Sequence, residues 1–193
     1  LDENKKYRIL TAVLINQYRQ DIAQTYAAKF RDSENLSNFK PVILFKATKT
    51  IDDSKENEKL FHEIIGNLTN KDLEDIMGRI NHPVIKKIFD FYKKEGISIS
   101  DLIKQKIKIN FSKKHCINVN ETDLEKKSIK KEDEEEVITQ QNLLNSLEDK
   151  NNKIRVIFAV QKLNEGWDVL NLYDIVRISE KQASGGGTEG GIA

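Results

Sequence analysis

The sequence predicts an α/β fold in which a parallel sheet carries helices on both of its faces. Short and almost continuous apolar segments, such as residues 154–160, are typical of strands that are buried on both sides. Longer segments with apolar residues at helical spacing lie between them along the chain. Strands that alternate with helices form parallel sheets, because each helix makes a right-handed crossover to the next strand.

The first predicted element is a helix over residues 7–30, followed by a polar loop over residues 32–38. Apolar or aromatic side chains recur in the helix at four-residue steps, which places them on one face. These residues are Leu10, Leu14, Tyr18, Ile22, Tyr26 and Phe30. Residues 1–38 are interpreted as a helix and linker that belong to a preceding domain.

A buried strand is predicted over residues 41–45, with its proline at the first position, where a strand tolerates it. A loop over residues 48–50 leads into a helix that Asp52 or Asp53 is expected to cap. Gly66 is expected to end that helix. Its apolar face contains Leu60, Phe61, Ile64 and Ile65.

Residues 67–112 are predicted to form a helical insertion. Segments 69–72 and 98–101 have the form of capping boxes, with Asp in place of the favoured Glu. Pro83 suits a first helical turn, and Gly96 suits a helix terminus. Helices, rather than further strands, are therefore expected here.

The second half of the chain is predicted to contribute three strands, at residues 115–119, 154–160 and 172–178. Residues 121–136 are dense in charge and nearly free of large apolar side chains, which predicts an exposed, mobile segment. Helical periodicity returns over residues 137–147. These segments complete the alternation of strands and helices that a parallel sheet requires.

Composition limits the classes of function that the chain can have. Hydrophobic residues make up 38% of the 193 residues and charged residues 33%, which suits one highly charged domain with a core. The 32 Lys and Arg residues nearly balance the 31 Asp and Glu residues, so nucleic-acid binding would need local basic patches. The single cysteine, Cys116, excludes an internal disulfide and a thiolate metal cluster.

The two ends favour a piece of a longer, cytoplasmic protein. Leu1 is not an initiator methionine, and residues 179–193 are expected to form a flexible, glycine-rich loop. No apolar run approaches membrane-spanning length, and the first residues lack a signal-peptide pattern. A reducing cytoplasm without membrane contact is therefore expected.

The polar stretch after residues 154–160 is the candidate functional centre, because doubly wound sheets bind ligands at the carboxyl ends of their strands. It contains Asn164, Gly166 and Asp168. Glycine allows a positive φ or a close approach of the backbone to a ligand. The carboxylate of Asp168 can accept hydrogen bonds from ribose hydroxyls, each worth about 1.5–3 kcal/mol. The residues alone leave open that these three side chains simply form a turn and cap the next helix.

This stretch also carries a resemblance to a known family. Residues 159–168, AVQKLNEGWD, resemble motif V of superfamily 2 helicases and translocases. Residues 163–177, LNEGWDVLNLYDIVR, resemble the restriction (Res) subunits of type III restriction–modification systems. The strand at 41–45 and the KATKT that follows look like motif IV of the same domain. The resemblance implies that residues 39–193 form the second RecA-like domain of an ATP-dependent DNA translocase.

The resemblance also implies roles for individual residues. In that family the glycine and aspartate of motif V lie beside the nucleotide ribose, and the preceding loop touches the DNA backbone. Gly166 and Asp168 are therefore candidates for the ATP side. Val160, Gln161 and Asn164 are candidates for the DNA side, although many related motors have a phosphate-binding threonine at the position of Val160, where only the backbone amide could serve.

Two threonines after the strand at 41–45 are further candidates for DNA contacts. Thr48 and Thr50 lie in a loop at the carboxyl end of that strand, where their hydroxyls could bond phosphates. Capping of the next helix is an equal alternative for them. Trp167 is likewise either a stacking residue or a core aromatic.

The phosphate cradle and the main magnesium ligands of such motors are absent from this sequence. It contains no GxxxxGK[ST] and no Asp-Glu-x-His sequence. ATP and Mg²⁺ are therefore expected to be held mainly by the first motor domain, and the arginine finger is expected beyond the last residue. No catalytic residue is assigned to this chain, and the chain alone is expected to be inactive.

The basic stretch and the histidines are the remaining residues with groups that can bind phosphates or metal ions. The lysines between Lys104 and His115 could follow a phosphate backbone, or they could form a solvated helix face. His62, His82 and His115 show no ligand spacing with other His, Cys or paired carboxylates, so no metal site is assigned.

The resulting hypothesis is a motor domain of a type III restriction endonuclease subunit that couples ATP hydrolysis to DNA translocation before cleavage. Its expected partners are double-stranded DNA, the first RecA-like domain and a nuclease domain of the same chain, and the modification methyltransferase subunit. One alternative is a superfamily 2 DNA helicase or repair translocase outside restriction. Another is a non-catalytic nucleotide- or DNA-binding α/β module.

Overall fold

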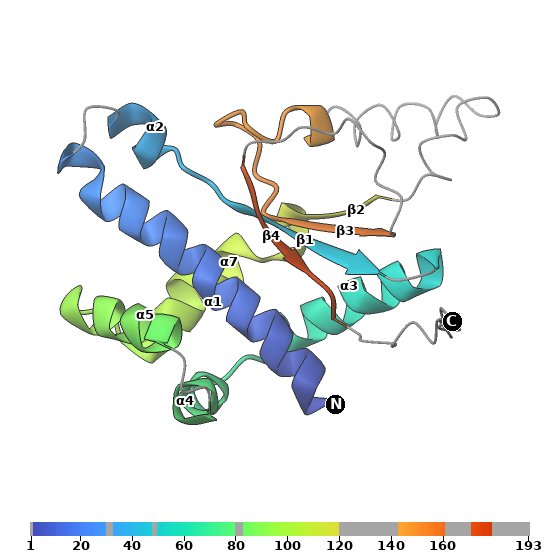
Figure 1. The fold of residues 1–193 in the computed structure, drawn as a ribbon, viewed down its shortest axis with the longest axis horizontal. Coiled ribbons are helices and arrows are strands. Elements are labelled where there is room, and N and C mark those ends of the chain that lie inside the picture. The colour runs from blue at the N-terminus through green and yellow to red at the C-terminus, as the bar shows by residue number, and fades with distance from the viewer. Residues whose placement is uncertain are drawn as a thin grey trace, which may run out of the picture.

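A four-stranded parallel sheet forms the centre of the molecule (Figure 1). The computed structural model describes residues 2–29, 33–47, 50–79, 83–119, 143–160 and 171–178. The strands are β1 (Val42–Ala47), β2 (Cys116–Val119), β3 (Val156–Val160) and β4 (Leu172–Val176). Their spatial order is β2-β3-β1-β4, and every neighbouring pair is parallel. The predicted α/β class is confirmed.

The central strands β1 and β3 are apolar without alternation because both of their faces are covered. They pair directly, with Ile43 opposite Val156 and Phe45 opposite Phe158. One face of the pair belongs to a core cluster that includes the helices α1 (Glu3–Tyr26) and α3 (Ile51–Gly66). The other face belongs to a second cluster, which contains Val42, Leu44, Ile157 and Ala159.

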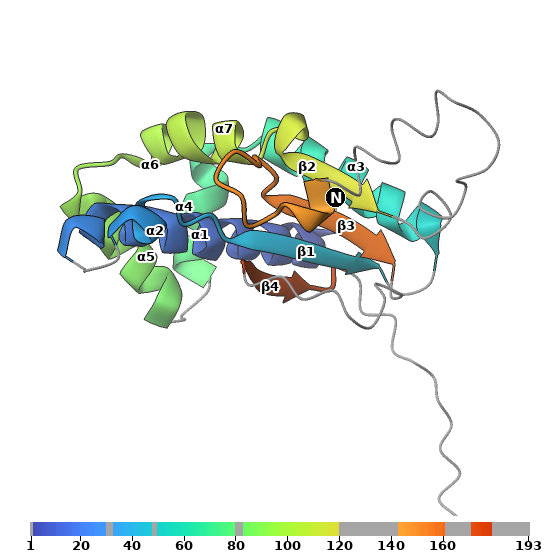
Figure 2. The same cartoon turned by 90° about the horizontal axis from the view of Figure 1, so that it is seen from above.

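Residues 143–147 cover that second face. Leu144 and Leu147 are 6% and 1% exposed and pack in the second cluster. Figure 1 shows this part of the chain above the sheet and the helices α4 (Asn70–Arg79) and α5 (Pro83–Lys94) below it. Figure 2 shows β1 between β3 and β4. The sheet is thus a middle layer with apolar contacts on both faces, as the apolar strands predict.

The aromatic centre of the larger cluster joins α3 to the sheet. The rings of Phe45 and Phe158 are stacked with centroids 5.5 Å apart, and the ring of Phe61 meets Phe158 edge-on at 5.5 Å. All three side chains are fully buried. Burial of one such side chain stabilises a fold by about 1.5–3 kcal/mol.

The described part of residues 67–112 consists of helices joined by short turns, such as those at 67–69 and 95–98. After α4 and α5 come α6 (Ile99–Asp101), a π-helix η2 (Leu102–Ile107), α7 (Lys108–Asn110) and the 3₁₀ turn η3 (Lys113–His115). Pro83 begins α5, and Gly96 follows its end with a φ of +70°. The amide of Ile97 donates to the Tyr92 carbonyl at 2.9 Å, which closes a Schellman-type end.

The first helix differs from its prediction in extent and in what it buries. It begins at Glu3, because Asp2 caps it by accepting from the Asn4 amide at 3.0 Å, and it ends at Tyr26. The polar side chains of Asn16, Gln17 and Asp21 are buried, whereas the predicted apolar stripe is only half-buried over Tyr18, Ile22 and Tyr26. The first half of the predicted stripe is buried as expected, at Leu10 and Leu14, so the polar side chains are buried beside the apolar face and do not replace it.

Two local predictions are wrong. The polar segment expected as a loop contains a short helix, α2 (Ser33–Ser37), whose end closes when the Asn38 amide donates to the Glu34 carbonyl at 3.1 Å. The cap of α3 is Thr50 and neither of the two aspartates that follow it. Thr50 and Asp53 form a reciprocal capping box, which fixes the helix start two residues earlier than a cap at Asp52 would.

Several expectations lie outside the described residues. These are the structure of residues 121–136, the first part of the helical segment at 137–147 and the glycine-rich residues 179–193. Among the helices that are described, none is both long enough and apolar enough to cross a membrane.

Candidate functional site

The carboxyl edge of the sheet is where the predicted ATP and DNA contacts should gather. Because β1 and β3 are parallel neighbours, they end side by side, with Ala47 opposite Val160. The chain leaves β1 toward Thr50 and leaves β3 toward the loop that resembles motif V. Loops at this edge are the usual ligand-binding elements of open α/β sheets.

The structure describes two of the seven candidate residues. Val160 is the last residue of β3 and is half-buried, and Thr50 is the first residue described after β1. The other candidates lie outside the described residues. They are Thr48, Gln161, Asn164, Gly166 and Asp168. The register of β1 and β3 brings the two described residues to the same edge of the sheet.

Thr50 has a structural role that the sequence left open. Its Oγ1 accepts a hydrogen bond from the Asp53 amide at 3.1 Å, and the Asp53 carboxylate accepts one from the Thr50 amide at 3.2 Å. The capping alternative is therefore confirmed. A cap uses an oxygen lone pair and leaves the hydroxyl hydrogen free to donate, so the DNA contact stays a prediction.

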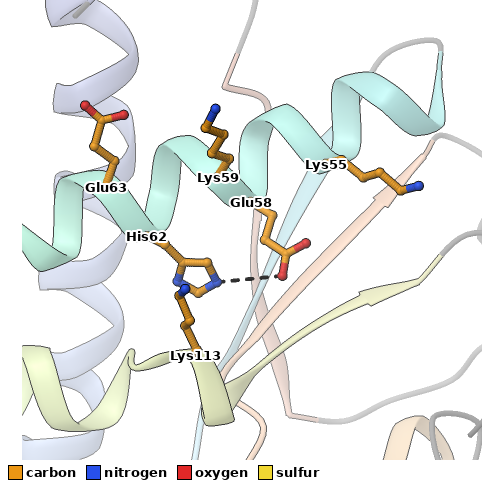
Figure 3. Close-up of a pocket in the computed structure, with 6 residues that line it drawn as sticks. All are labelled: Lys55, Glu58, Lys59, His62, Glu63 and Lys113. Carbon is orange, nitrogen blue, oxygen red and sulfur yellow. Dashed lines mark ion pairs between the residues drawn. The ribbon is translucent and has the colours of Figure 1, made fainter.

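A chain of polar side chains links α3 to β2. Ser54 is fully buried and donates its hydroxyl to Asn118 Oδ1 at 3.1 Å. Asn118 in turn donates its Nδ2–H to the Glu58 carboxylate at 2.8 Å. His62 Nε2 lies 3.7 Å from the same carboxylate, one helical turn further along α3 (Figure 3). The nearby His62 ring is the main reason why the pKa of Glu58 is lowered.

Two members of this polar chain, Glu58 and His62, line a surface pocket of about 440 Å³. The remaining lining residues are Lys55, Lys59 and Glu63 of α3, together with Lys113 of η3. Lys113 reaches this pocket from a segment some fifty residues further along the chain (Figure 3). We call this site the α3 pocket.

The basic stretch between Lys104 and His115 does not form a single surface. Lys106 donates to the Asp21 carboxylate at 3.1 Å, and Lys108 donates to the Gly66 carbonyl at 2.8 Å. Lys113 lines the α3 pocket instead. The fold therefore assigns neighbouring lysines of one sequence run to different tasks.

The amino edge of the sheet holds a different kind of polar site. Arg155, immediately before β3, is 3% exposed and lies beneath α1. Its Nε–H donates to the Pro41 carbonyl at 3.1 Å, and its Nη2 donates to Asn16 Oδ1 at 2.6 Å. Its guanidinium also covers the Phe111 ring at 4.8 Å. Burial lowers the pKa of Arg155 to about 10, so the group remains charged at neutral pH.

Asp21 extends this buried network toward the helical insertion. Its carboxylate accepts hydrogen bonds from Gln17 at 3.0 Å, from the Tyr92 hydroxyl at 2.9 Å and from Lys106. Burial, followed by the charge of Asp21, raises the pKa of Tyr92 far above its ordinary value. The network therefore joins α1, α5 and η2 through the buried Asp21 carboxylate.

A second pocket, of about 690 Å³, also lies near the amino edge, and Lys40 is one of its lining residues. Burial and the charge of Arg155 lower the pKa of Lys40 to about 8. Its ammonium group donates to the backbone carbonyls of Asn152 and Asp149, the latter at 3.3 Å. Lys40 thereby ties β1 to the turn before β3, which is a structural task.

Metal and thiol chemistry receive no support from the described part of the chain. No group of three or more His, Cys, Asp or Glu side chains there is arranged to hold a metal ion. Cys116 packs against the core, and burial raises the pKa of its thiol to about 12, so it stays protonated at neutral pH. His115 donates from Nδ1 to the Ile109 carbonyl at 2.8 Å.

Sequence reasoning did not single out the α3 pocket. Lys55 and Lys59, and also Glu58 and His62, are spaced four residues apart on a predicted helix, so each pair lies on one helix face. That spacing was visible in the sequence. The contributions of Asn118 and Lys113 were not, because only the fold brings them to α3.

Comparison with known proteins supports the resemblance drawn from the residues. The chain matches no family model and no solved structure. It is 36% identical over 197 aligned positions to the probable type III restriction-modification enzyme HindVIP Res subunit of Haemophilus influenzae. The alignment covers 94% of this chain, and the chain spans about a third (35%) of the length of that relative. The chain is therefore Res-like over nearly its whole length.

Proposed function

We propose that this chain serves as the second RecA-like motor domain of a type III Res subunit. In this role it takes part in ATP-driven movement along double-stranded DNA before cleavage. Similarity to a Res subunit over nearly the whole chain supports the restriction-related role. The parallel sheet supports the motor role, because ligands of such sheets bind at the carboxyl ends of the strands.

The register of β1 and β3 is the observation that carries this proposal. With Ala47 opposite Val160, the threonine loop and the motif V loop leave from adjacent strand ends. The side chains of Thr48, Thr50, Gln161 and Asn164, together with the backbone amide of Val160, would contact DNA phosphates from this edge. A single edge would thus sense both DNA and nucleotide.

Gly166 and Asp168 would form the nucleotide side of the same loop. Glycine would let the backbone approach the ribose, and the Asp168 carboxylate would accept hydrogen bonds from its hydroxyls. ATP with Mg²⁺, held mainly by the first motor domain, would supply the energy for closing and opening of the two domains. The chain alone would not hydrolyse ATP, because it lacks the phosphate cradle.

The partners proposed for this chain follow from the family. The chain spans only about a third of its relative, so further domains of a Res subunit would have to supply the first motor domain and the nuclease. A modification methyltransferase subunit would complete the enzyme. Double-stranded DNA is the proposed substrate of the assembly.

Replacement of Asp168 tests this proposal. In the complete Res subunit, Asp168→Ala is expected to lower DNA-stimulated ATP hydrolysis at least tenfold, since one charge-assisted bond of about 1.5–3 kcal/mol is lost. Asp90→Ala, at an exposed position on α5, is the matched control. Equal ATPase rates in Asp168→Ala and the unmodified subunit would refute the motor assignment.

A further inference from the structure

We propose that Trp167 packs on the second face of the sheet, over Ile175 of β4. Trp167 lies outside the described residues, in the connection between two strands that are described, β3 and β4. Packed in this way, it would be a core aromatic and would not stack on a nucleotide or a base. This packing is independent of the motor role, because it concerns only how the chain covers its own sheet.

Ile175 lies on the second face of the sheet without a cover among the described residues. It pairs with Leu44, which belongs to the second core cluster, so both side chains point to that face. The preceding residue, Asp174, points to the other face, where it accepts from Asn16 of α1 at 3.1 Å. Leu44 is 4% exposed, whereas Ile175 is 65% exposed. Parallel sheets are covered on both faces, so the cover over β4 has to come from elsewhere in the chain.

The handedness of the crossovers assigns the β3–β4 connection to that same face. The connection from β1 to β2 contains α3, which packs in the first cluster. The connection from β2 to β3 runs in the opposite direction across the sheet, and Leu144 and Leu147 place it on the second face. Right-handed crossovers that run in opposite directions lie on opposite faces, and these two do so. From β3 to β4 the chain again runs in the second direction, so residues 161–171 would cross the second face.

The strand register points to Trp167 as the residue above Ile175. Measured along β1, Ile175 lies three residues before the level of Val160, and Leu172 lies five residues before it. A connection that returns evenly from Val160 to Leu172 has covered three-fifths of its length at residue 167. The gap that it spans is about 20 Å, since five strand residues extend about 17 Å and two strand spacings add about 10 Å sideways. Trp167 is therefore expected over Ile175.

The apolar residues of the connection are spaced to cover an apolar face. Leu163, Trp167 and Leu170 lie four and three residues apart, which is the spacing of one side of a helical segment. Trp167 is the largest of the three, and an aromatic side chain of its kind buries about 150–250 Å². One ring of this size is enough to cover the exposed Ile175 side chain.

Fluorescence of the 193-residue chain tests this packing, because Trp167 is its single tryptophan. The unmodified chain is expected to emit at a shorter wavelength than N-acetyltryptophanamide in water and to be quenched less by acrylamide. Ile175→Ser removes the apolar surface beneath the ring, so its emission should shift to longer wavelength and its quenching should increase. Ile109→Ser is the matched control, because Ile109 is also exposed (52%) but lies on α7 of the helical insertion.

Three results would overturn the packing of Trp167 on Ile175. The first is emission and quenching of the unmodified chain equal to those of the free model compound, which would place the ring in solvent. The second is an unchanged emission in Ile175→Ser, and the third is an equal shift in Ile109→Ser. Far-UV circular dichroism checks that Ile175→Ser keeps its helices, and if it does not, Ile175→Ala replaces it at lower polarity. None of these measurements involves ATP or DNA, so their outcome is separate from that of Asp168→Ala.

Discussion

Arg155 at the amino edge of the sheet is 3% exposed and donates to Asn16 of α1 and to the Pro41 carbonyl before β1. By contrast, Lys55 and Lys59 on α3 are exposed and lack a carboxylate partner among the described residues. Both sets of cations lie beside the same sheet. The buried guanidinium holds α1 against the strands, while the exposed ammonium groups remain in solvent. Burial and hydrogen-bond partners, together with charge, therefore separate a structural cation from a solvated one.

The difference follows from the direction of the strands. All four strands begin at the amino edge, where backbone hydrogen bonds hold neighbouring strands in register. The amides of Ile43 and Arg155 join neighbouring strand starts by donating to the carbonyls of Arg155 and His115 at 2.9 and 2.8 Å. The loops that follow β1 and β3 leave from the carboxyl edge, where open α/β sheets bind their ligands.

The largest expected effect on stability comes from a substitution at the amino edge. Arg155→Ala should lower the free energy of unfolding by about 3–5 kcal/mol, because it leaves a cavity and strips the buried Asn16 and Pro41 acceptors of their donor. The urea-unfolding midpoint of the chain measures this loss. Arg155→Met fills much of the space and should cost less.

Lys153→Ala, at an exposed position two residues earlier, is the control for Arg155 and should change stability by less than about 0.5 kcal/mol. If Arg155→Ala costs no more than this control, the buried network does not stabilise the amino edge. The contrast between the two edges would then lose its energetic basis.

A smaller effect on stability is expected from substitutions of Thr50 at the carboxyl edge. Thr50→Ala should destabilise the chain by about 1 kcal/mol through loss of the α3 cap. Thr50→Asp keeps a capping oxygen and should restore that stability, but its negative charge should weaken DNA binding by the complete subunit. Paired unfolding and DNA-binding measurements separate the two tasks, and normal DNA binding by Thr50→Asp would exclude a phosphate contact at this residue.

The smallest expected effect concerns pH at the amino edge. Burial lowers the pKa of His115 in the folded chain, with further contributions from Lys114, Arg155 and Lys153. The unfolded chain therefore binds the proton more readily, and stability should fall as the pH drops below about 6.5 toward the folded pKa. Unfolding free energies between pH 7 and lower pH measure the slope, which His115→Asn should flatten.

Lys93→Ala on α5 should keep the pH slope of the unmodified chain, since it lies in an exposed position away from His115. A slope in His115→Asn equal to that of the unmodified chain would assign the pH dependence to another group. Glu58 titrates at more acidic pH, because its lowered pKa lies below the ordinary carboxyl value.

Local patterns were sufficient for the strands and for most helix ends. The consecutive apolar residues of β1 and β3 indicate burial on both faces of the sheet. Pro83 and Gly96 mark the two ends of α5 through their own backbone conformation. Such features depend on neighbours in sequence, so the sequence reports them directly. The predicted start of α3 was wrong because Thr50, Asp52 and Asp53 are all residue types that cap helices, and the sequence does not show which one does so.

The tasks of charged side chains could not be predicted in this way. Arg155 only interrupts an apolar run in sequence, yet its hydrogen-bond partner Pro41 is 114 residues away. Lys106 and Lys113 look equivalent in one basic stretch, but the first is bound to Asp21 and the second reaches the α3 pocket. Long-range contacts decide which charges are neutralised inside the protein.

The sequence by itself determined the α/β class, the Res-like resemblance and the location of the candidate loops, since these depend on periodicity and on contiguous motifs. Only the tertiary structure decided that Thr50 and Val160 reach one edge of the sheet, because their proximity depends on the register of two strands more than a hundred residues apart. It also decided which lysines remain exposed, because the cost of burying a charge is met only by partners that folding brings into place.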